Sequence, residues 1–138
     1  MRKEEPIKTI MTKDLITINL SNTLYTAEKR LKTHNVRHMP VVDGHKLIGL
    51  ISLSDLKRLS FLDAYSIEGT EDTATYDMLS IEDIMIKNPV TVSSNTTIME
   101  VAELLAHKKF HSLPVVDKGE LVGIVTTTDL LNYFIAAS

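Results

Sequence analysis

Apolar residues recur at helical spacing in two separate stretches of the chain. In each stretch they are three or four positions apart, which places them on one face of an α-helix. The two sets are Leu24, Ala27, Leu31 and Ile98, Val101, Ala102, Leu105. Thr97 and Glu100 stand at the start of the second set in the Ser/Thr-x-x-Glu form of a capping box, which predicts the first turn of that helix.

Runs of β-branched and aliphatic residues follow each predicted helix. Met39–Val42 and Leu47–Ile51 flank a short polar turn, and so do Leu113–Val116 and Leu121–Val125. Paired runs of this kind predict β-hairpins. A brief β-rich run such as Val90–Val92 comes before the helix, and helical spacing resumes after the hairpin. Both stretches therefore follow the order β-α-β-β-α.

The two stretches are copies of one unit. Pro40–Asp43 reads Pro-Val-Val-Asp and recurs as Pro114–Asp117, an offset of 74 residues (114 minus 40). At that offset, residues 7–60 align with 81–134 without a gap, and 15 of the 54 pairs are identical. Internal repetition over such a length predicts two tandem structural repeats. We therefore expect an α/β (α+β) protein with repeat 1 at 7–60 and repeat 2 at 81–136.

An acidic segment joins the two repeats. Residues 61–80 contain five Asp or Glu and neither Lys nor Arg. Such a composition is typical of a surface loop, so we expect a passive connector. A lid over a binding cleft is the alternative.

Composition excludes several classes of protein. The chain has 138 residues, of which 43% are hydrophobic and 24% charged, as in ordinary soluble domains. A formal net charge of −3 argues against a nucleic-acid binder, which needs a basic face. The absence of cysteine excludes a thiol nucleophile and a cysteine-built zinc site. No apolar run approaches the roughly 20 residues of a membrane span, and Met1–Pro6 does not resemble a signal peptide, so a cytoplasmic location is expected.

One motif occurs where a strand passes into a helix in each repeat. Gly49–Asp55 and Gly123–Asp129 share the order Gly, two apolar residues, Ser or Thr, two further residues and Asp. One interpretation is purely structural: the hydroxyl caps the helix, and the Asp three residues later completes a capping box.

The other interpretation of the motif is a nucleotide site. The first turn of a helix has free N–H groups that bind anions, and a carboxylate can accept two hydrogen bonds from a ribose diol. Gly49 and Gly123 have no Cβ, so a flat base could approach the strand closely. The spacing alone leaves both interpretations open.

The combined pattern resembles a known family. The doubled β-α-β-β-α unit, the segments His38–Asp43 and Ser112–Asp117, and the two Gly-to-Asp motifs are similar to a tandem pair of CBS domains, a Bateman module. The resemblance implies two repeats packed sheet to sheet about a pseudo-twofold axis, with a cleft on each side. It also implies a homodimer, and clefts that bind AMP, ADP or ATP, and less often S-adenosylmethionine.

The resemblance further implies a role for each matching residue. Asp55 and Asp129 would bind ribose, and Ser52 and Thr126 would contact phosphate. Further phosphate contacts are implied at Arg37, His38, Lys109 and His111, and the adenine slots at Ile16, Met39, Val90 and Leu113.

Two further kinds of site are weighed and set aside. His34 and His38, like His107 and His111, are four residues apart, but each pair is expected to straddle a helix end and a strand start, which spoils metal ligation. No nucleophile elbow such as Gly-x-Ser-x-Gly occurs. We therefore expect no metal, no catalytic cofactor and no enzyme activity.

The function expected from the sequence is regulatory. A stand-alone pair of repeats would sense an adenine nucleotide and modulate a partner protein whose identity the sequence does not give. A structural or dimerisation module with vestigial clefts, or one that binds S-adenosylmethionine or another adenosyl ligand, is the alternative.

Overall fold

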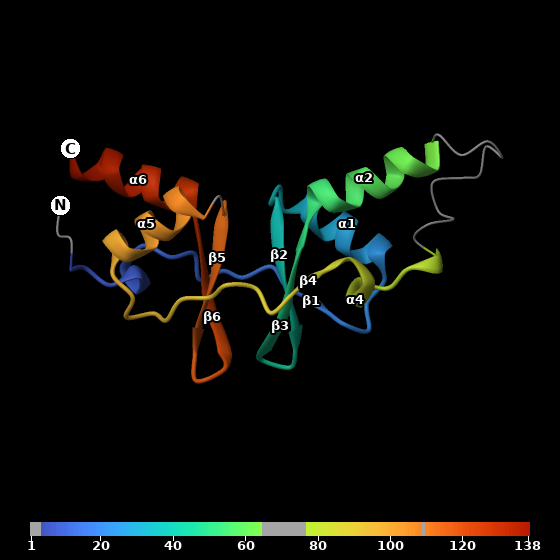
Figure 1. Cartoon of the computed structure of the whole chain (residues 1–138), viewed down its shortest axis with the longest axis horizontal. Helices are drawn as coiled ribbons and strands as arrows, with labels where there is room; N and C mark the ends of the chain where they lie inside the picture. The colour runs from blue at the N-terminus through green and yellow to red at the C-terminus, as the bar shows by residue number, and fades with distance from the viewer. Residues whose placement is uncertain (1–3, 65–76, 109) are drawn as a thin grey trace. The chain divides into compact units, whose positions relative to one another are not determined.

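A computed structural model describes residues 4–64, 77–108 and 110–138. Its elements follow the order expected for two α/β repeats (Figure 1). Along the first repeat and the segment after it they are the 3₁₀ turn η1 (Ile7–Thr9), β1 (Ile18–Asn19), α1 (Leu24–Thr33), β2 (His38–Asp43), β3 (Lys46–Ser52) and α2 (Leu53–Ala64). Along the second they are α4 (Ile81–Ile84), β4 (Ile86–Lys87), α5 (Ile98–His107), β5 (Ser112–Asp117), β6 (Glu120–Thr126) and α6 (Thr127–Ala137).

The chain forms two compact units that exchange their leading segments. The first-repeat unit contains Ile16–Gly44 and Ile48–Asn88. The second-repeat unit contains the segment up to Leu15, His45–Leu47 and Pro89–Ser138. The start of each sequence repeat is therefore part of the compact unit built around the other repeat.

The first-repeat unit places two helices against a small sheet. β1 pairs in parallel with β2, which is followed in the sheet by β3, and β4 pairs antiparallel with β3. α1 and α2 contact each other and lie on one side of these strands (Figure 1). The core contains the predicted helix face and residues of both hairpin strands: Ile18, Leu24, Ala27, Leu31, Met39, Val41, Ile51, Leu56 and Ile81.

The second-repeat unit repeats this arrangement. β5 and β6 form an antiparallel hairpin, and α5 and α6 contact each other beside it (Figure 1). Its buried core residues are Ile7, Val92, Ile98, Val101, Leu105, Leu113, Val115, Val125 and Leu130. Removing a side chain of this size from water contributes about 1.5–3 kcal/mol, so the apolar stripes identified in the sequence hold both units together.

Several local expectations are refined by the structure. Val90–Val92 contributes only one isolated bridge, between Val92 and Val115, rather than a full strand. Thr97 accepts a hydrogen bond from the N–H of Glu100 at 3.1 Å, but the return bond of a capping box is not formed among the described residues. Within the acidic segment 61–80, residues 65–76 lie outside the described part. The passive connector and the lid both stay predictions.

No helix in the described ranges combines the length and the apolar run that crossing a bilayer requires.

Candidate functional site

The second-repeat motif forms a complete capping box at the start of α6. The Thr126 hydroxyl accepts from the N–H of Asp129 at 3.1 Å, and the Asp129 carboxylate accepts from the N–H of Thr126 at 3.0 Å. The structural interpretation of this motif is therefore realised. The capping box does not use every acceptor position of the Asp129 carboxylate, because its two oxygens offer about four.

A second donor reaches the same carboxylate from the N-terminal segment. The Thr12 hydroxyl lies 3.2 Å from both carboxylate oxygens of Asp129. Backbone bonds hold Thr12 in place, since its N–H donates to Ile124 O at 2.8 Å and its carbonyl accepts from Ile124 N at 3.0 Å. Asp129 is thus surrounded by neutral donors, and the described residues offer it no ion pair within 4.0 Å.

The first-repeat motif holds its carboxylate differently. The Ser52 hydroxyl, buried at the end of β3, accepts from the N–H of Asp55 at 3.2 Å and lies 3.2 Å from the Ser54 hydroxyl. The Asp55 carboxylate accepts from Nη2 of Arg58, one turn along α2, at 3.0 Å. This carboxylate therefore carries a cation beside it.

Equivalent backbone pairings occur beside the two motifs, but the side chains differ. Ile86 pairs with Leu50 in the first-repeat unit just as Thr12 bridges to Ile124 in the second. At the offset of 74 residues, Thr12 matches Ile86 and Arg58 matches Asn132. Ile86 has no hydroxyl to offer Asp55, and Asn132 has no charge to offer Asp129.

The predicted cationic positions lie next to the two helix starts. The carbonyl of Arg37 accepts from the N–H of Leu53 at 2.9 Å, and the carbonyl of His111 accepts from the N–H of Thr127 at 3.1 Å. Both side chains are exposed. Each first helical turn is therefore tied to the residue that the resemblance assigns to phosphate.

The remaining candidates for phosphate are placed less fully. His38 begins β2 and is half-buried. Lys109 lies outside the described residues. Their roles stay predictions.

The two motif glycines are close-approach positions, but the approaching group is a methionine and not a ligand. A Cβ on Gly123 would lie 2.6 Å from Sδ of Met11, and a Cβ on Gly49 would collide with Sδ of Met85. Met11 and Met85 are repeat-equivalent and each comes from the exchanged leading segment. In this structure a methionine sulfur lies against each of these glycines. The expectation that a flat base approaches them stays a prediction.

The predicted adenine-slot residues divide into two groups. Met39 and Leu113 are 0% and 1% exposed and belong to the two cores, so they offer no side-chain surface to a ligand in this structure. Ile16 is half-buried against the first core, and Val90 is 47% exposed. The structure gives the first pair a packing role, and an adenine role for any of the four stays a prediction.

Three residues near the motifs were not predicted from the sequence. Thr12 and Arg58 differ in type from their partners at the 74-residue offset, and that difference was the available signal. Ser112 lies opposite Thr126 in the β5–β6 register, and its hydroxyl is buried without a hydrogen-bond partner among the described residues. Nothing in the sequence distinguishes Ser112 from an ordinary strand serine.

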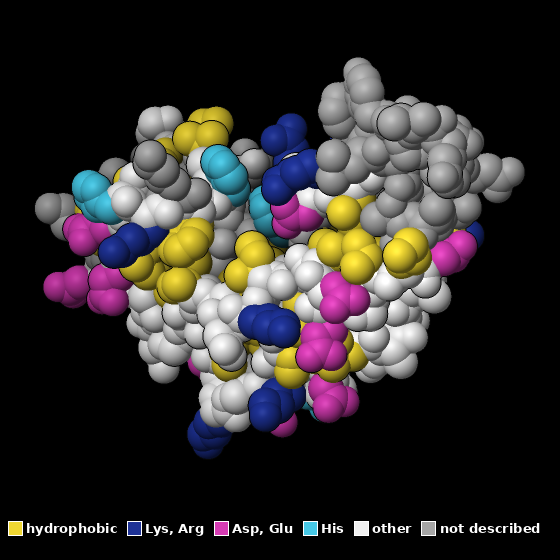
Figure 2. All heavy atoms as spheres, turned by 45° about the vertical axis from the view of Figure 1, so that its right-hand side comes forward, with side chains coloured by type: hydrophobic (Ala, Val, Ile, Leu, Met, Phe, Trp, Pro, Cys, Tyr) yellow, Lys and Arg dark blue, Asp and Glu magenta, His cyan; other side chains and the backbone are white. Residues whose placement is uncertain are grey.

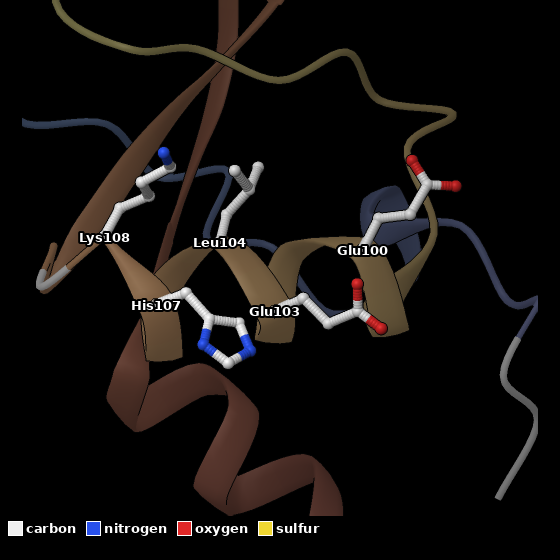
Figure 3. Close-up of a pocket in the computed structure, with 5 residues that line it drawn as sticks. All are labelled: Glu100, Glu103, Leu104, His107 and Lys108. Atoms are coloured by element: carbon white, nitrogen blue, oxygen red, sulfur yellow. The ribbon is translucent and has the colours of Figure 1, made fainter.

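One hollow lies away from the two motifs. A shallow hollow on α5 is lined by Glu100, Glu103, Leu104, His107 and Lys108, whose side chains point to both sides of the helix (Figure 3). None of the predicted site residues lines this hollow.

The described ranges contain no group of three His, Cys, Asp or Glu that could hold a metal ion. His34 caps the end of α1 and His38 begins β2, so that pair straddles two elements as expected. His107 likewise ends α5, and His111 precedes β5.

Charged side chains of both signs are mixed on the face shown in Figure 2, and they do not gather into one basic surface there. This distribution lacks the basic stripe of a nucleic-acid binder on that face.

Comparison with known proteins completes the description. A family model described as CBS domain matches residues 7–61 and 81–136. A CBS domain-containing protein of Dictyostelium discoideum is 39% identical over 132 residues, covering 94% of this chain and 90% of that protein. The crystal structure of CBSX2 in complex with AMP superposes with a TM-score of 0.80 at 28% identity, covering 96% of this chain and 98% of that one.

A second solved structure carries different ligands. The CBS domain pair of protein MJ0100, in complex with 5′-methylthioadenosine and S-adenosyl-L-methionine, superposes with a TM-score of 0.77 at 28% identity. The match covers 96% of this chain and 98% of that one. The α/β fold class expected from the repeat pattern is confirmed.

Proposed function

Because the chain belongs to the CBS domain family, we propose that it is a regulatory module that binds adenine nucleotides and modulates a partner protein. Modules of similar fold hold AMP in one case and S-adenosylmethionine with methylthioadenosine in another. The shared chemistry of these ligands is an adenosine, so a ribose-binding carboxylate is the feature that this chain must provide.

The observation that carries the proposal is the pair of carboxylates at the helix starts. Asp55 and Asp129 stand at N-terminal first turns, each tied through the backbone to an exposed Arg37 or His111. A helix start with free N–H groups attracts phosphate, and a nearby carboxylate accepts from ribose hydroxyls. A cap alone would need the hydroxyl and the carboxylate, but it would not need a basic or imidazole side chain in the same place.

Calorimetry of the purified protein against adenosine, AMP, ADP, ATP, NAD and S-adenosylmethionine tests the proposal. We expect saturable binding of at least one phosphorylated adenine nucleotide, lost in Asp55→Ala/Asp129→Ala. Binding of S-adenosylmethionine alone would make the chain an adenosyl sensor instead. If none of the six compounds binds, the alternative is a structural module whose clefts hold no ligand. The complete capping box at Asp129 is consistent with that alternative.

We also propose that the module forms a homodimer through α6. Leu131, Phe134 and Ile135 are 55%, 38% and 71% exposed and share one face of this helix at spacings of three and four. Leu130 and Leu59, also near the helix ends, pack in or against the cores and leave the exposed face to the other three. A contiguous apolar face of this kind favours burial in a symmetric interface.

Light scattering at micromolar concentration measures the mass directly. A dimer of the 15.4 kDa chain is expected, with Leu131→Glu shifting it to monomer and Asn132→Glu, on the same helix, leaving it intact. A monomer in the parent protein overturns the dimer and leaves the ligand proposal untouched.

The module is proposed to act through its partner and not by catalysis. The two matched repeats contain the candidate side chains, and these carry charges and hydroxyls suited to binding without an activated nucleophile. A cytoplasmic location stays part of this proposal.

A further inference from the structure

We infer that Arg58 makes the two nucleotide sites select different ligands. The first-repeat site, with Arg58 on its carboxylate, would prefer a polyphosphate such as ATP. The second-repeat site, whose carboxylate is held by neutral donors, would prefer an adenosyl ligand of low negative charge. The inference rests on the proposed function, since it assumes that Asp55 and Asp129 bind ribose.

The geometry at Asp55 leaves Arg58 able to bind a ligand and the carboxylate at the same time. Nη2 of Arg58 lies 3.0 Å from Oδ1 of Asp55, and the Arg58 side chain is 70% exposed. A guanidinium has five N–H donors, so one bond to Asp55 leaves donors free. Helical side chains lean toward the helix N-terminus, which brings this cation over the first turn of α2, where Ser52 caps the helix.

A cation at that place changes the preferred ligand. Arginine and phosphate form bidentate, charge-assisted hydrogen bonds, and each added phosphate increases the attraction. Arg37 is exposed, and its carbonyl accepts from Leu53 N at the start of the same helix. The site thus pairs one carboxylate for ribose with the Arg58 guanidinium for a phosphate chain, and a second arginine is bonded through its backbone to the same helix start.

The geometry at Asp129 has the opposite balance. Its carboxylate accepts from the Thr12 hydroxyl and from Thr126 N, which are both neutral, so no cation lies beside it among the described residues. Asn132 replaces the arginine, and His111 replaces Arg37. A ligand with several phosphates would be repelled by this carboxylate, whereas an uncharged or cationic adenosyl group would not.

Exchanging the two equivalent residues tests the inference. Arg58→Asn and Asn132→Arg are made in otherwise unchanged protein, and also in Asp129→Ala and Asp55→Ala backgrounds that each leave one site. Calorimetry against adenosine, AMP, ADP, ATP and S-adenosylmethionine then gives the affinity at each site. Lys109 is kept in every variant, so its charge is common to all measurements.

We expect Arg58→Asn to weaken ATP at the first site about fivefold, AMP less, and adenosine not at all. Asn132→Arg should strengthen ATP at the second site by a similar factor. Both effects should shrink at 0.5 M salt, because exposed charges are screened. Circular dichroism melting of each variant checks that the fold is retained.

Two results overturn the inference without touching the proposed function. If Arg58→Asn changes adenosine and ATP by the same factor, Arg58 only competes with ribose for Asp55. If ATP and S-adenosylmethionine share one site in the parent protein, the two sites are not specialised. The proposed function fails in a different way, by the parent protein binding none of the ligands.

Discussion

The two repeats build the same backbone at the strand-to-helix junction and then hold its carboxylate in different ways. In the second repeat, Asp129 is fixed by a capping box and by Thr12 from the exchanged segment. In the first, Asp55 is paired with Arg58 on the same helix. One carboxylate is therefore oriented by a capping box and a tertiary contact, and the other by a local ion pair that solvent screens.

This comparison separates capping from binding. A carboxylate that completes a capping box stabilises its helix whether or not a ligand comes, so its presence alone does not establish a site. What the two junctions share beyond the cap is the residue before the Pro-Val-Val strand, Arg37 or His111, bonded through its carbonyl to the first helical turn. The carbonyl bond helps to cap the helix, whereas the exposed side chain of Arg37 or His111 has no role in capping and is the better indication of a ligand.

The largest effect is expected from removing each carboxylate. Asp129→Ala and Asp55→Ala should each lower nucleotide affinity at their own site by about 10- to 100-fold, since hydrogen bonds to charged groups contribute about 1.5–3 kcal/mol. Asp→Asn keeps the shape and one acceptor and should cost less. Calorimetry and thermal melting are measured together on all four variants.

The stability readout distinguishes the two junctions. Asp129→Ala removes a capping box and should lower the free energy of unfolding by about 1 kcal/mol. Asp55→Ala removes only an exposed ion pair and should cost less than that. If both alanine variants lose stability yet bind AMP as the parent protein does, the motif is a cap in both repeats.

The next effect concerns the methionines that cover the motif glycines. Gly123→Ala forces Met11 to move from its place on the strand and should destabilise the protein by about 1–3 kcal/mol. In a Met11→Ala background the same substitution should cost much less, because the colliding sulfur is gone. Chemical unfolding of the two single variants and the double variant gives the coupling. At Gly49 the relief from Met85→Ala should be smaller, because a Cβ there would also lie 3.0 Å from the backbone carbonyl oxygen of Ile86. Equal costs in both backgrounds would show that the backbone, and not the methionine, resists a side chain at Gly123.

The methionines also show where sequence reasoning stops. Local sequence patterns predict the helices, the hairpins and the Thr126–Asp129 capping box, because each depends on residues close in sequence. They cannot predict that Met11 covers Gly123 or that Thr12 donates to Asp129. These contacts arise because the leading segments are exchanged between units, and no local pattern records an exchange.

The sequence contains the charge difference between the two junctions, but it does not indicate that the difference affects a site. Arg58 and Asn132 differ at equivalent positions, as many exposed helical residues do. The 3.0 Å contact between Arg58 and Asp55 shows that this difference puts a cation beside one of the two proposed ribose-binding carboxylates. Met39 and Leu113 illustrate the reverse case, since a resemblance assigned them to a slot and the packing places them in the cores.

A smaller effect is expected from exchanging the hydroxyl donor. Thr12→Val keeps the shape of Thr12 but removes its bond to Asp129, and should cost about 0.5–1.5 kcal/mol of stability. In an Asp129→Asn background the cost should fall, because the charged acceptor is gone. Ile86→Thr is the matched gain in the first repeat, where the equivalent backbone pairing already exists. Additive costs for Thr12→Val and Asp129→Asn would mean that the hydroxyl and the carboxylate do not interact.

The smallest effect is a pH dependence from Asp117 in the second repeat. Ser94 donates to Asp117 from its hydroxyl at 2.6 Å and from its N–H at 3.0 Å. These bonds, the hydroxyl bond first, hold the pKa of Asp117 below its ordinary value, against a smaller opposing effect of burial. In the first repeat, Asp43 is equivalent to Asp117 and Leu20 is equivalent to Ser94. Leu20 has no hydrogen-bond donor in its side chain.

The sign of the effect follows from the direction of that shift. A carboxylate whose pKa is lower in the folded protein stabilises it when ionised, so the contribution is fully present above the pKa of the unfolded chain. It is lost as pH falls below about 4 and through the lower folded value. Ser94→Ala should therefore lower the melting temperature slightly at pH 6, and the difference from the parent protein should shrink as the pH falls. Asp43→Asn, the matched change in the first repeat, should shift the melting temperature by less at pH 6 than Asp117→Asn does. Melting curves between pH 2 and pH 6 that run parallel for the parent protein and Ser94→Ala would show that the bonds to Asp117 do not favour its charged form.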